Sequence, residues 1–186
     1  MAHYQVSPTR LDVKIANAIA RRTDPAYENA AELLTWGADE HVLVALAAAF
    51  WLYGRNAGAR QRIASNHLLL VTAVATLLPH LFKGVFDQKR PDRCTILGHV
   101  HGVPLSGRPR DAFPSGHAMH VGALASAATE LPPAERNAVW LIGAGLVATR
   151  VVLLAHWLSD VLAGLAIGAI LERLLRFWTG FGRSKA

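Results

Sequence analysis

The chain has 186 residues, of which 52% are hydrophobic and 17% charged, and its mean hydropathy is +0.26. This composition excludes a disordered chain, exceeds the apolar content of an ordinary soluble domain and indicates an integral membrane protein. The formal charge is +6, but the basic residues lie between apolar runs, which argues against nucleic-acid binding. The single cysteine, Cys94, excludes an internal disulfide and a cysteine-built zinc site.

Residues 1–186 are predicted to form a single membrane-embedded domain that begins with an amphipathic segment, residues 1–35. Within that segment, apolar side chains recur at helical spacing at Leu11, Ile15 and Ile19. Two interpretations are equally open. The helix either lies on the membrane surface or packs against the rest of the protein.

Five apolar segments follow, and each is expected to be a membrane-spanning helix. They cover residues 42–54, 68–86, 115–128, 138–155 and 158–177. The first has 13 residues, whereas a span needs about 20. It must therefore extend upstream through Asp39 or end at the interface. The predicted fold class is all-α: a polytopic transmembrane helix bundle with about five spans plus the N-terminal amphipathic helix.

Residues 87–113 are predicted to form an extramembrane loop beside the active site, because they are rich in proline, glycine and charge. The loop contains His99 and His101. A metal site there would need a third and a fourth ligand that the sequence does not offer, so an ordinary pair of loop histidines is the favoured interpretation.

Two cations interrupt or follow the second apolar segment. Lys83 and Arg90 are seven residues apart, so a continuous helix would point both the same way, and Pro91 would end that helix. A charge within a span costs about 2.5–3.5 kcal/mol and therefore calls for a reason. The pair either forms an anion-binding site or consists of two side chains that snorkel to the interface at a helix end.

The sequence Pro114-Ser115-Gly116-His117 opens the third span. Proline and serine before an apolar run mark a helix N-terminus, whose unpaired N–H groups form a ready phosphate site. Gly116 would let the backbone approach an anion closely, and His117 could give a proton to a leaving oxygen. A serine cap followed by a histidine without function explains the motif equally simply.

The third group joins Arg150, His156 and Asp160. Asp160, four residues after His156, is expected on the same helical face, where it would accept the Nδ1 proton and leave Nε2 as a nucleophile. The Arg150 guanidinium suits phosphate oxygens. The alternative is a buried, salt-bridged cluster that holds helices together.

Topology favours a common site for the three groups. With five spans, the end of the second, the start of the third and the link between the fourth and fifth must emerge on one membrane face. Independent structural clusters have no reason to share that face.

The pattern Lys83-x6-Arg90-Pro91, Pro114-Ser115-Gly116-His117 and Arg150-x5-His156-x3-Asp160 resembles the three-part signature of the type 2 phosphatidic acid phosphatase superfamily. The resemblance implies that His156 attacks phosphorus to form a phosphohistidine, that Asp160 orients it, and that His117 protonates the leaving alkoxide. The implied ligands of the phosphoryl oxygens are Lys83, Arg90, Ser115, Gly116 and Arg150. No metal and no cofactor are implied. Thr149 stands where the family usually has serine.

The resemblance implies a membrane phosphatase acting on a lipid phosphate or diphosphate within the membrane. The candidate substrates are phosphatidylglycerol phosphate, phosphatidic acid, undecaprenyl diphosphate and a lipid A phosphate. A lipid phosphotransferase using the same phosphohistidine and a non-catalytic lipid-phosphate-binding protein remain alternatives. By the same resemblance the protein lies in a bacterial inner membrane with its site facing the periplasm, although the count of basic residues alone favours a cytoplasmic loop. The oligomeric state stays open.

Two further arginines, Arg108 and Arg110, precede the third span. A solvated basic loop near anionic headgroups is their default explanation. The sharper hypothesis is that one of them binds a headgroup or a second phosphate.

Overall fold

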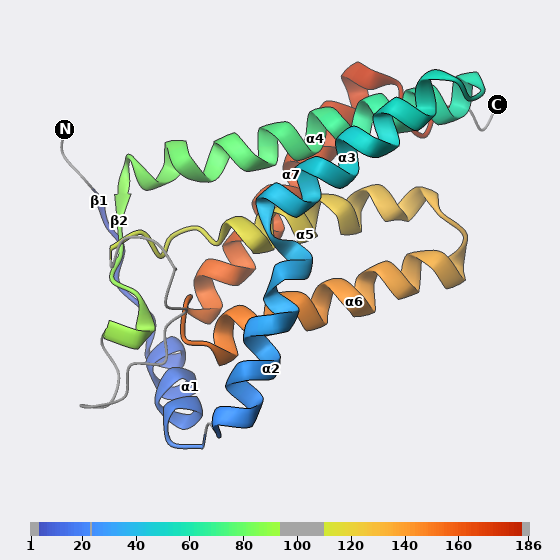
Figure 1. The fold of residues 1–186 in the computed structure, drawn as a ribbon. Coiled ribbons are helices and arrows are strands. Elements are labelled where there is room, and N and C mark those ends of the chain that lie inside the picture. Colours follow the sequence, from blue (N-terminus) through green and yellow to red (C-terminus); the bar gives the residue numbers. More distant parts are fainter. Residues whose placement is uncertain (1–3, 23, 94–109, 184–186) are drawn as a thin grey trace.

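A computed structural model describes residues 4–22, 24–93 and 110–183 (Figure 1). The chain forms seven α-helices in this part: α1 (Arg10–Ala20), α2 (Pro25–Thr35), α3 (Glu40–Arg55), α4 (Ala59–Lys83), α5 (Gly116–Ala127), α6 (Pro133–Val152) and α7 (Leu158–Thr179). Short 3-10 helices η1 (Trp36–Ala38), η2 (Pro91–Arg93) and η3 (Ala128–Glu130) join them. Strands β1 (Tyr4–Gln5) and β2 (Phe86–Asp87) pair in parallel. The helical expectation is confirmed except for this small sheet.

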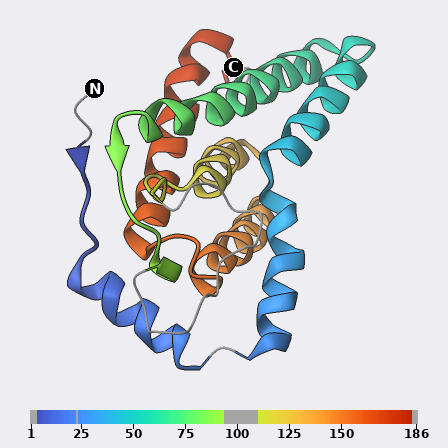
Figure 2. The same ribbon diagram turned by 60° about the vertical axis from the view of Figure 1, so that its left-hand side comes forward.

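Helix α5 lies inside the bundle, with α4, α6 and α7 around it (Figure 2). Its packing against α7 depends on small residues. A Cβ at Gly168 would clash with the carbonyl oxygen of Met119, and one at Gly122 would clash with the backbone of Leu165. Glycines therefore let the two backbones approach closely, as they do between helices in lipid.

Helices α3 and α4 form an antiparallel hairpin joined by residues 56–58 (Figure 1). The Trp51 indole donates a hydrogen bond across it to the Asn66 side chain, at 2.9 Å. By length and composition, two described stretches can cross a membrane: Ala26–Arg55 and Ala59–Lys83. The count of five spans stays a prediction.

Helix α3, which contains the first apolar segment, begins at Glu40. Asp39 has an extended backbone and caps α3, because its carboxylate accepts a hydrogen bond from the His41 N–H at 2.9 Å. Before this cap, η1 and α2 continue the helical path. The segment thus becomes long enough to span by joining α2, η1 and α3.

Helix α1 packs against the protein. Its Ala16 and Ala20 are buried against Leu154 and Trp157, at the link between α6 and α7. Asp12, the N3 residue of the capping box with Thr9, accepts hydrogen bonds from the backbone and hydroxyl of Ser159 at 2.9 and 2.8 Å. The structure therefore favours the packed form of the N-terminal helix over one that contacts only lipid.

The second apolar helix ends at Lys83, and the predicted continuation to Arg90 is wrong. The chain turns at Gly84, whose N–H bonds back to the His80 carbonyl, and then enters β2. Strand β1 supplies two backbone hydrogen bonds here, from the Tyr4 N–H to the Val85 carbonyl and from the Val6 N–H to the Asp87 carbonyl. A helix through this stretch would forgo that pairing.

Candidate active site

The three sequence groups meet at one end of the bundle. Hydrogen bonds connect the segment that follows α4, the N-terminal end of α5 and the link between α6 and α7 there, and Lys83 at the end of α4 forms an ion pair with Asp111. The Ser115 N–H, for example, donates to the Asp160 carbonyl at 3.2 Å. His117 lies in the first turn of α5, close enough to Lys83 and Arg150 for their positive charges to act on its ring. The structure thus brings all three motifs together.

Lys83 and Arg90, called the cation pair below, are joined by Asp111. The Nε and Nη2 groups of Arg90 donate to Asp111 Oδ1 at 3.0 and 2.9 Å, and Lys83 Nζ lies 3.6 Å from Oδ2. Arg90 Nη1 also donates to the Ala155 carbonyl at 3.3 Å. Both cations therefore contact the same carboxylate, although the helix ends between them. Sequence reasoning missed Asp111, a carboxylate shortly before the Pro114 motif.

His156 lies in the link before α7 and is buried. Its Nδ1 is 2.7 Å from the carbonyl oxygen of Ala112. A carbonyl can only accept, so Nδ1 carries the proton and Nε2 keeps its lone pair. The tautomer is the expected one, but its acceptor is a backbone group.

Asp160 lies 3.8 Å from Nδ1 of His156, through its Oδ2 atom. The same oxygen accepts a hydrogen bond from the Trp157 N–H at 2.9 Å, at the start of α7. The expected direct hydrogen bond from His156 to Asp160 is therefore absent. The carboxylate instead holds the backbone that follows His156, because it accepts the Trp157 N–H.

Burial lowers the pKa of His156 well below its ordinary value of 6.5, and the positive charges of Arg150, Arg90 and Lys83 lower it further. The hydrogen bond to the Ala112 carbonyl acts in the opposite direction but does not outweigh these effects. The imidazole is therefore neutral at pH 7, as a nucleophile must be.

Ser115 caps α5, with its hydroxyl accepting from the Ala118 N–H at 3.4 Å. A Cβ at Gly116 would make only ordinary contacts, at 3.6 Å from the Pro79 ring. Packing within the protein thus does not require glycine at this position. A close approach by a ligand to the first N–H groups of α5 is a sufficient reason for it.

Arg150 is buried near the end of α6. Its Nη1 donates to the Thr35 hydroxyl of α2 at 2.9 Å, while its Nε has no partner within the described part of the chain. A buried guanidinium with donors to spare is suited to bind an anion. Thr149 directs its hydroxyl to the Leu146 carbonyl at 2.6 Å. Sequence reasoning missed Thr35 because α2 is distant in the chain.

The predicted loop, residues 87–113, is described only at its two ends. Arg110 is exposed, and its Nε lies 3.0 Å from Asp87 Oδ1. Arg108, His99, His101 and Cys94 lie outside the described residues. Across residues 4–22, 24–93 and 110–183, no group of three or more His, Cys, Asp or Glu side chains is placed to hold a metal ion.

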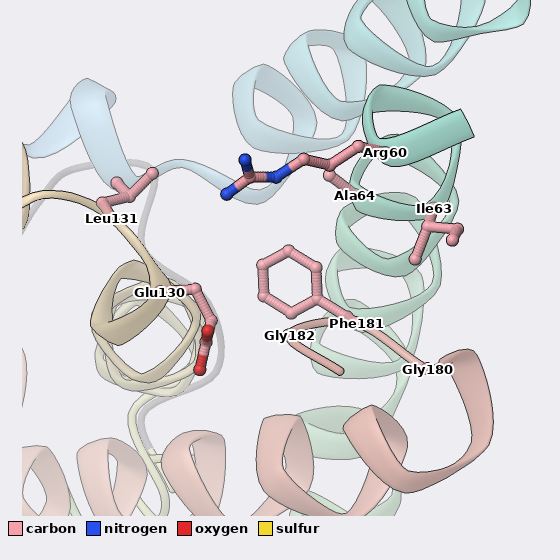
Figure 3. Close-up of a pocket in the computed structure, with 8 residues that line it drawn as sticks. All are labelled: Arg60, Ile63, Ala64, Glu130, Leu131, Gly180, Phe181 and Gly182. Atoms are coloured by element: carbon pink, nitrogen blue, oxygen red, sulfur yellow. The ribbon is translucent and has the colours of Figure 1, made fainter. Parts of the chain in front are cut away.

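The other end of the bundle contains a second buried polar cluster, centred on Glu172. Its Oε1 lies 3.0 Å from His67 Nε2 and accepts from Arg176 Nε at 2.8 Å, while Oε2 accepts from the Ser126 hydroxyl. A cavity of about 140 Å³ lies beside it, with Arg60, Glu130 and Phe181 among its lining residues (Figure 3). Arg60 and Lys83, at opposite ends of α4, are about 35 Å apart along the helix, so this cavity is separate from the three sequence motifs.

The sequence model of the PAP2 superfamily matches residues 64–182, which include all three motifs. The chain is 38% identical over 104 residues to a lipid A 1-phosphatase of Rhizobium johnstonii and 38% identical over 103 residues to one of Rhizobium etli. These matches cover 55% of this chain but 43% and 44% of the two relatives. The chain therefore matches less than half the length of these curated relatives.

Two solved structures are similar in fold. The crystal structure of Aquifex aeolicus LpxE has a TM-score of 0.72 and 20% identity, covering 90% of this chain and 95% of that one. A transmembrane PAP2 type phosphatidylglycerolphosphate phosphatase from Bacillus subtilis has a TM-score of 0.64 and 21% identity, covering 91% and 85%. At these identities the likeness establishes the fold of the bundle.

Proposed function

This chain belongs to the PAP2 superfamily, and on that premise we propose that it is a membrane phosphatase that hydrolyses the terminal phosphate of a lipid phosphate or lipid diphosphate. One observation carries the proposal. The neutral His156 is buried beside three cations, with Nδ1 bonded to a backbone carbonyl and Nε2 left unprotonated. That arrangement suits attack on a phosphoryl group.

In the proposed reaction, Nε2 of His156 attacks phosphorus while the bond from phosphorus to the leaving oxygen breaks. His117 gives its proton to that oxygen, and the dephosphorylated lipid departs. Water then attacks the phosphohistidine, His117 takes a proton from the water, and the N–P bond breaks to release inorganic phosphate. The Ala112 carbonyl and the Asp160 carboxylate stabilise the positive charge that the imidazole carries in between.

Fixed positive charge stabilises the transition state. Lys83, Arg90 and Arg150 would bind the equatorial phosphoryl oxygens, together with Ser115 and the backbone N–H of Gly116 at the start of α5. These donors are held in place before the substrate arrives, so little reorganisation is needed during the reaction. No step requires a metal ion or another cofactor.

The protein is an integral membrane protein, as its apolar helices and membrane relatives indicate. We propose that the joined segment of α2, η1 and α3 crosses the bilayer, that α4, α5, α6 and α7 each cross it as well, and that the catalytic end faces the periplasm of a bacterial inner membrane. The basic-residue count that favours the opposite orientation includes Lys83, Arg90 and Arg150, whose charges the site itself explains. Such a site would lie at the level of lipid headgroups.

Among the candidate lipids, a lipid A phosphate is the first to test, because both sequence relatives are named lipid A 1-phosphatases. The experiment measures phosphate release by the purified protein in detergent from lipid A, phosphatidic acid, phosphatidylglycerol phosphate and undecaprenyl diphosphate, with His156→Ala as the control. Release by the wild type and not by the variant supports the proposal. Phosphate transfer to an added acceptor without release would identify a phosphotransferase. Binding of these lipids with neither reaction would identify a non-catalytic binding protein.

A further inference from the structure

Asp111 occupies a place in the site that neither the motifs nor the proposed reaction assign. Its side chain is 17% exposed and lies between the two members of the cation pair. Both hydrogen bonds from Arg90, through Nε and Nη2, go to the single oxygen Oδ1, while Oδ2 faces Lys83. One carboxylate thus sets the distance between two cations that come from different segments of the chain.

Asp111 leaves the cation pair able to bind phosphate. Arg90 has five N–H groups, of which the described contacts use two on Asp111 and one on the Ala155 carbonyl. Within the described part of the chain, two N–H groups of Arg90 are left for a ligand, and the Lys83 ammonium lies 3.6 Å from Oδ2. The carboxylate therefore orients these cations without filling their anion-binding capacity.

The backbone at Asp111 reaches the nucleophile. Residues 110–115, called the strap below, run beside Gln88. The backbone carbonyl of Gln88 accepts a hydrogen bond from the Ala112 N–H at 3.1 Å, and Gln88 forms a parallel β-bridge with Asp111. The carbonyl of Ala112 then holds Nδ1 of His156 at 2.7 Å. Two consecutive residues therefore contact both halves of the site, one through its side chain and the other through its backbone.

We propose that Asp111 is a positioning residue that sets His156 in register with the phosphate-binding cations. The carboxylate fixes the strap to Lys83 and Arg90, and the strap in turn fixes the imidazole through the Ala112 carbonyl. This inference rests on the proposed function, because the register matters only for in-line attack on a phosphoryl group.

The proposal predicts a loss in kcat without a loss of anion affinity. Without the carboxylate, as in Asp111→Ala, the strap can shift, and a displacement near 1 Å lowers a rate on the order of 100-fold. The cations remain and lose a neighbouring negative charge, so the inhibition constant for orthovanadate should stay equal or decrease. Asp111→Asn keeps an oxygen acceptor for Arg90 and should restore kcat to within about 10-fold of the wild type.

The experiment compares the wild type, Asp111→Ala, Asp111→Asn and the matched control Asp87→Asn. Asp87 also pairs with an arginine, but with the exposed Arg110 at the first residue of the strap, so its loss should change kcat less than about 2-fold. The readouts are kcat, KM, orthovanadate inhibition, the thermal midpoint and the ¹⁵N chemical shifts of the His156 ring. In Asp111→Ala the ring should move from a single Nδ1–H tautomer toward a mixture.

Three results would overturn the inference. Asp111→Ala with wild-type kcat would show that the register does not depend on the carboxylate. Equal losses of kcat and thermal midpoint in the alanine and asparagine variants would show a purely structural residue, as would an unchanged ring tautomer in Asp111→Ala. A wild type that releases no phosphate from any lipid would instead refute the proposed function, and the ¹⁵N shifts would still decide whether Asp111 positions the imidazole.

Discussion

The anchoring of Arg150 by α2 can be tested with one substitution. Thr35→Val replaces a hydroxyl by a methyl group of similar size and removes the acceptor that Arg150 Nη1 contacts at 2.9 Å. Both residues are buried, Thr35 at 6% and Arg150 at 5% exposure, so water cannot readily replace the lost partner. The guanidinium is left to reorient by itself when the substrate binds.

A hydrogen bond to a charged group contributes about 1.5–3 kcal/mol. If that free energy is lost only from the transition state, kcat/KM falls by about 10- to 150-fold, since each 1.36 kcal/mol corresponds to a factor of ten. The decrease should appear mainly in kcat, because Arg150 neutralises charge that develops as the leaving oxygen departs.

The assay is phosphate release from the best lipid of the panel and from a water-soluble aryl phosphate, with the thermal midpoint as a check on folding. Thr76→Val is the matched control, because that hydroxyl donates to the carbonyl of Thr72 at 2.9 Å and otherwise lies 3.4 Å from the His120 ring, so its loss removes a hydroxyl of the same kind that does not contact Arg150. A Thr35→Val variant with kcat/KM within 2-fold of the wild type and an unchanged midpoint would refute the argument that α2 positions Arg150.

The other predictions concern the nucleophile, pH, metal ions and the exposed arginine. His156→Ala should form no phosphoenzyme, whereas Asp160→Asn should form it slowly, because Asp160 lies 3.8 Å from Nδ1 and the Ala112 carbonyl still holds that proton; trapping radiolabelled phosphoenzyme distinguishes the two, and equal abolition would contradict this division. Because the pKa of His156 is lowered, the acid limb of the kcat/KM profile should fall clearly below pH 6.5, and a limb at or above 6.5 would show a protonatable, solvated imidazole. The same shift means that the unfolded chain binds more protons below pH 6.5, so the free energy of unfolding should decrease as the pH falls through that value. Exhaustive chelation should leave turnover intact; activity lost in chelator and restored by one divalent ion would exclude the proposed mechanism. Arg110→Ala should cause equal, small losses on a lipid diphosphate and the matching monophosphate, since Arg110 is exposed and paired with Asp87; a loss confined to the diphosphate would instead assign it a second phosphate.

Local signals in the sequence predicted the elements that carry the motifs. Proline and serine before an apolar run predicted the start of α5, and Ser115 is its N-cap in the structure. The beginning of α7 at Leu158 was predicted from its apolar run alone. Such features depend on residues within a few positions of one another, which is why a single sequence is enough to find them.

The gathering of the motifs also followed from the sequence, although they are distant in the chain. Successive crossings alternate in direction, so the ends that carry Lys83, His117 and His156 were expected on one face. The structure places them together at one end of the bundle. This prediction needs only the alternating direction of successive helices. It does not need the angles at which they pack.

The partners of the site residues were decided by the tertiary structure. The Ala112 carbonyl that holds His156 leaves no trace in the sequence, because every residue has a carbonyl group. Thr35 reaches Arg150 only because α2 packs on α6, and Asp111 reaches Arg90 only because the chain leaves α4 at Lys83 and pairs with β1. Periodicity and capping report local backbone preference, whereas these contacts depend on how distant segments pack. The sequence therefore identifies the residues that would carry the chemistry, whereas the hydrogen bonds that orient these residues arise only in the folded chain.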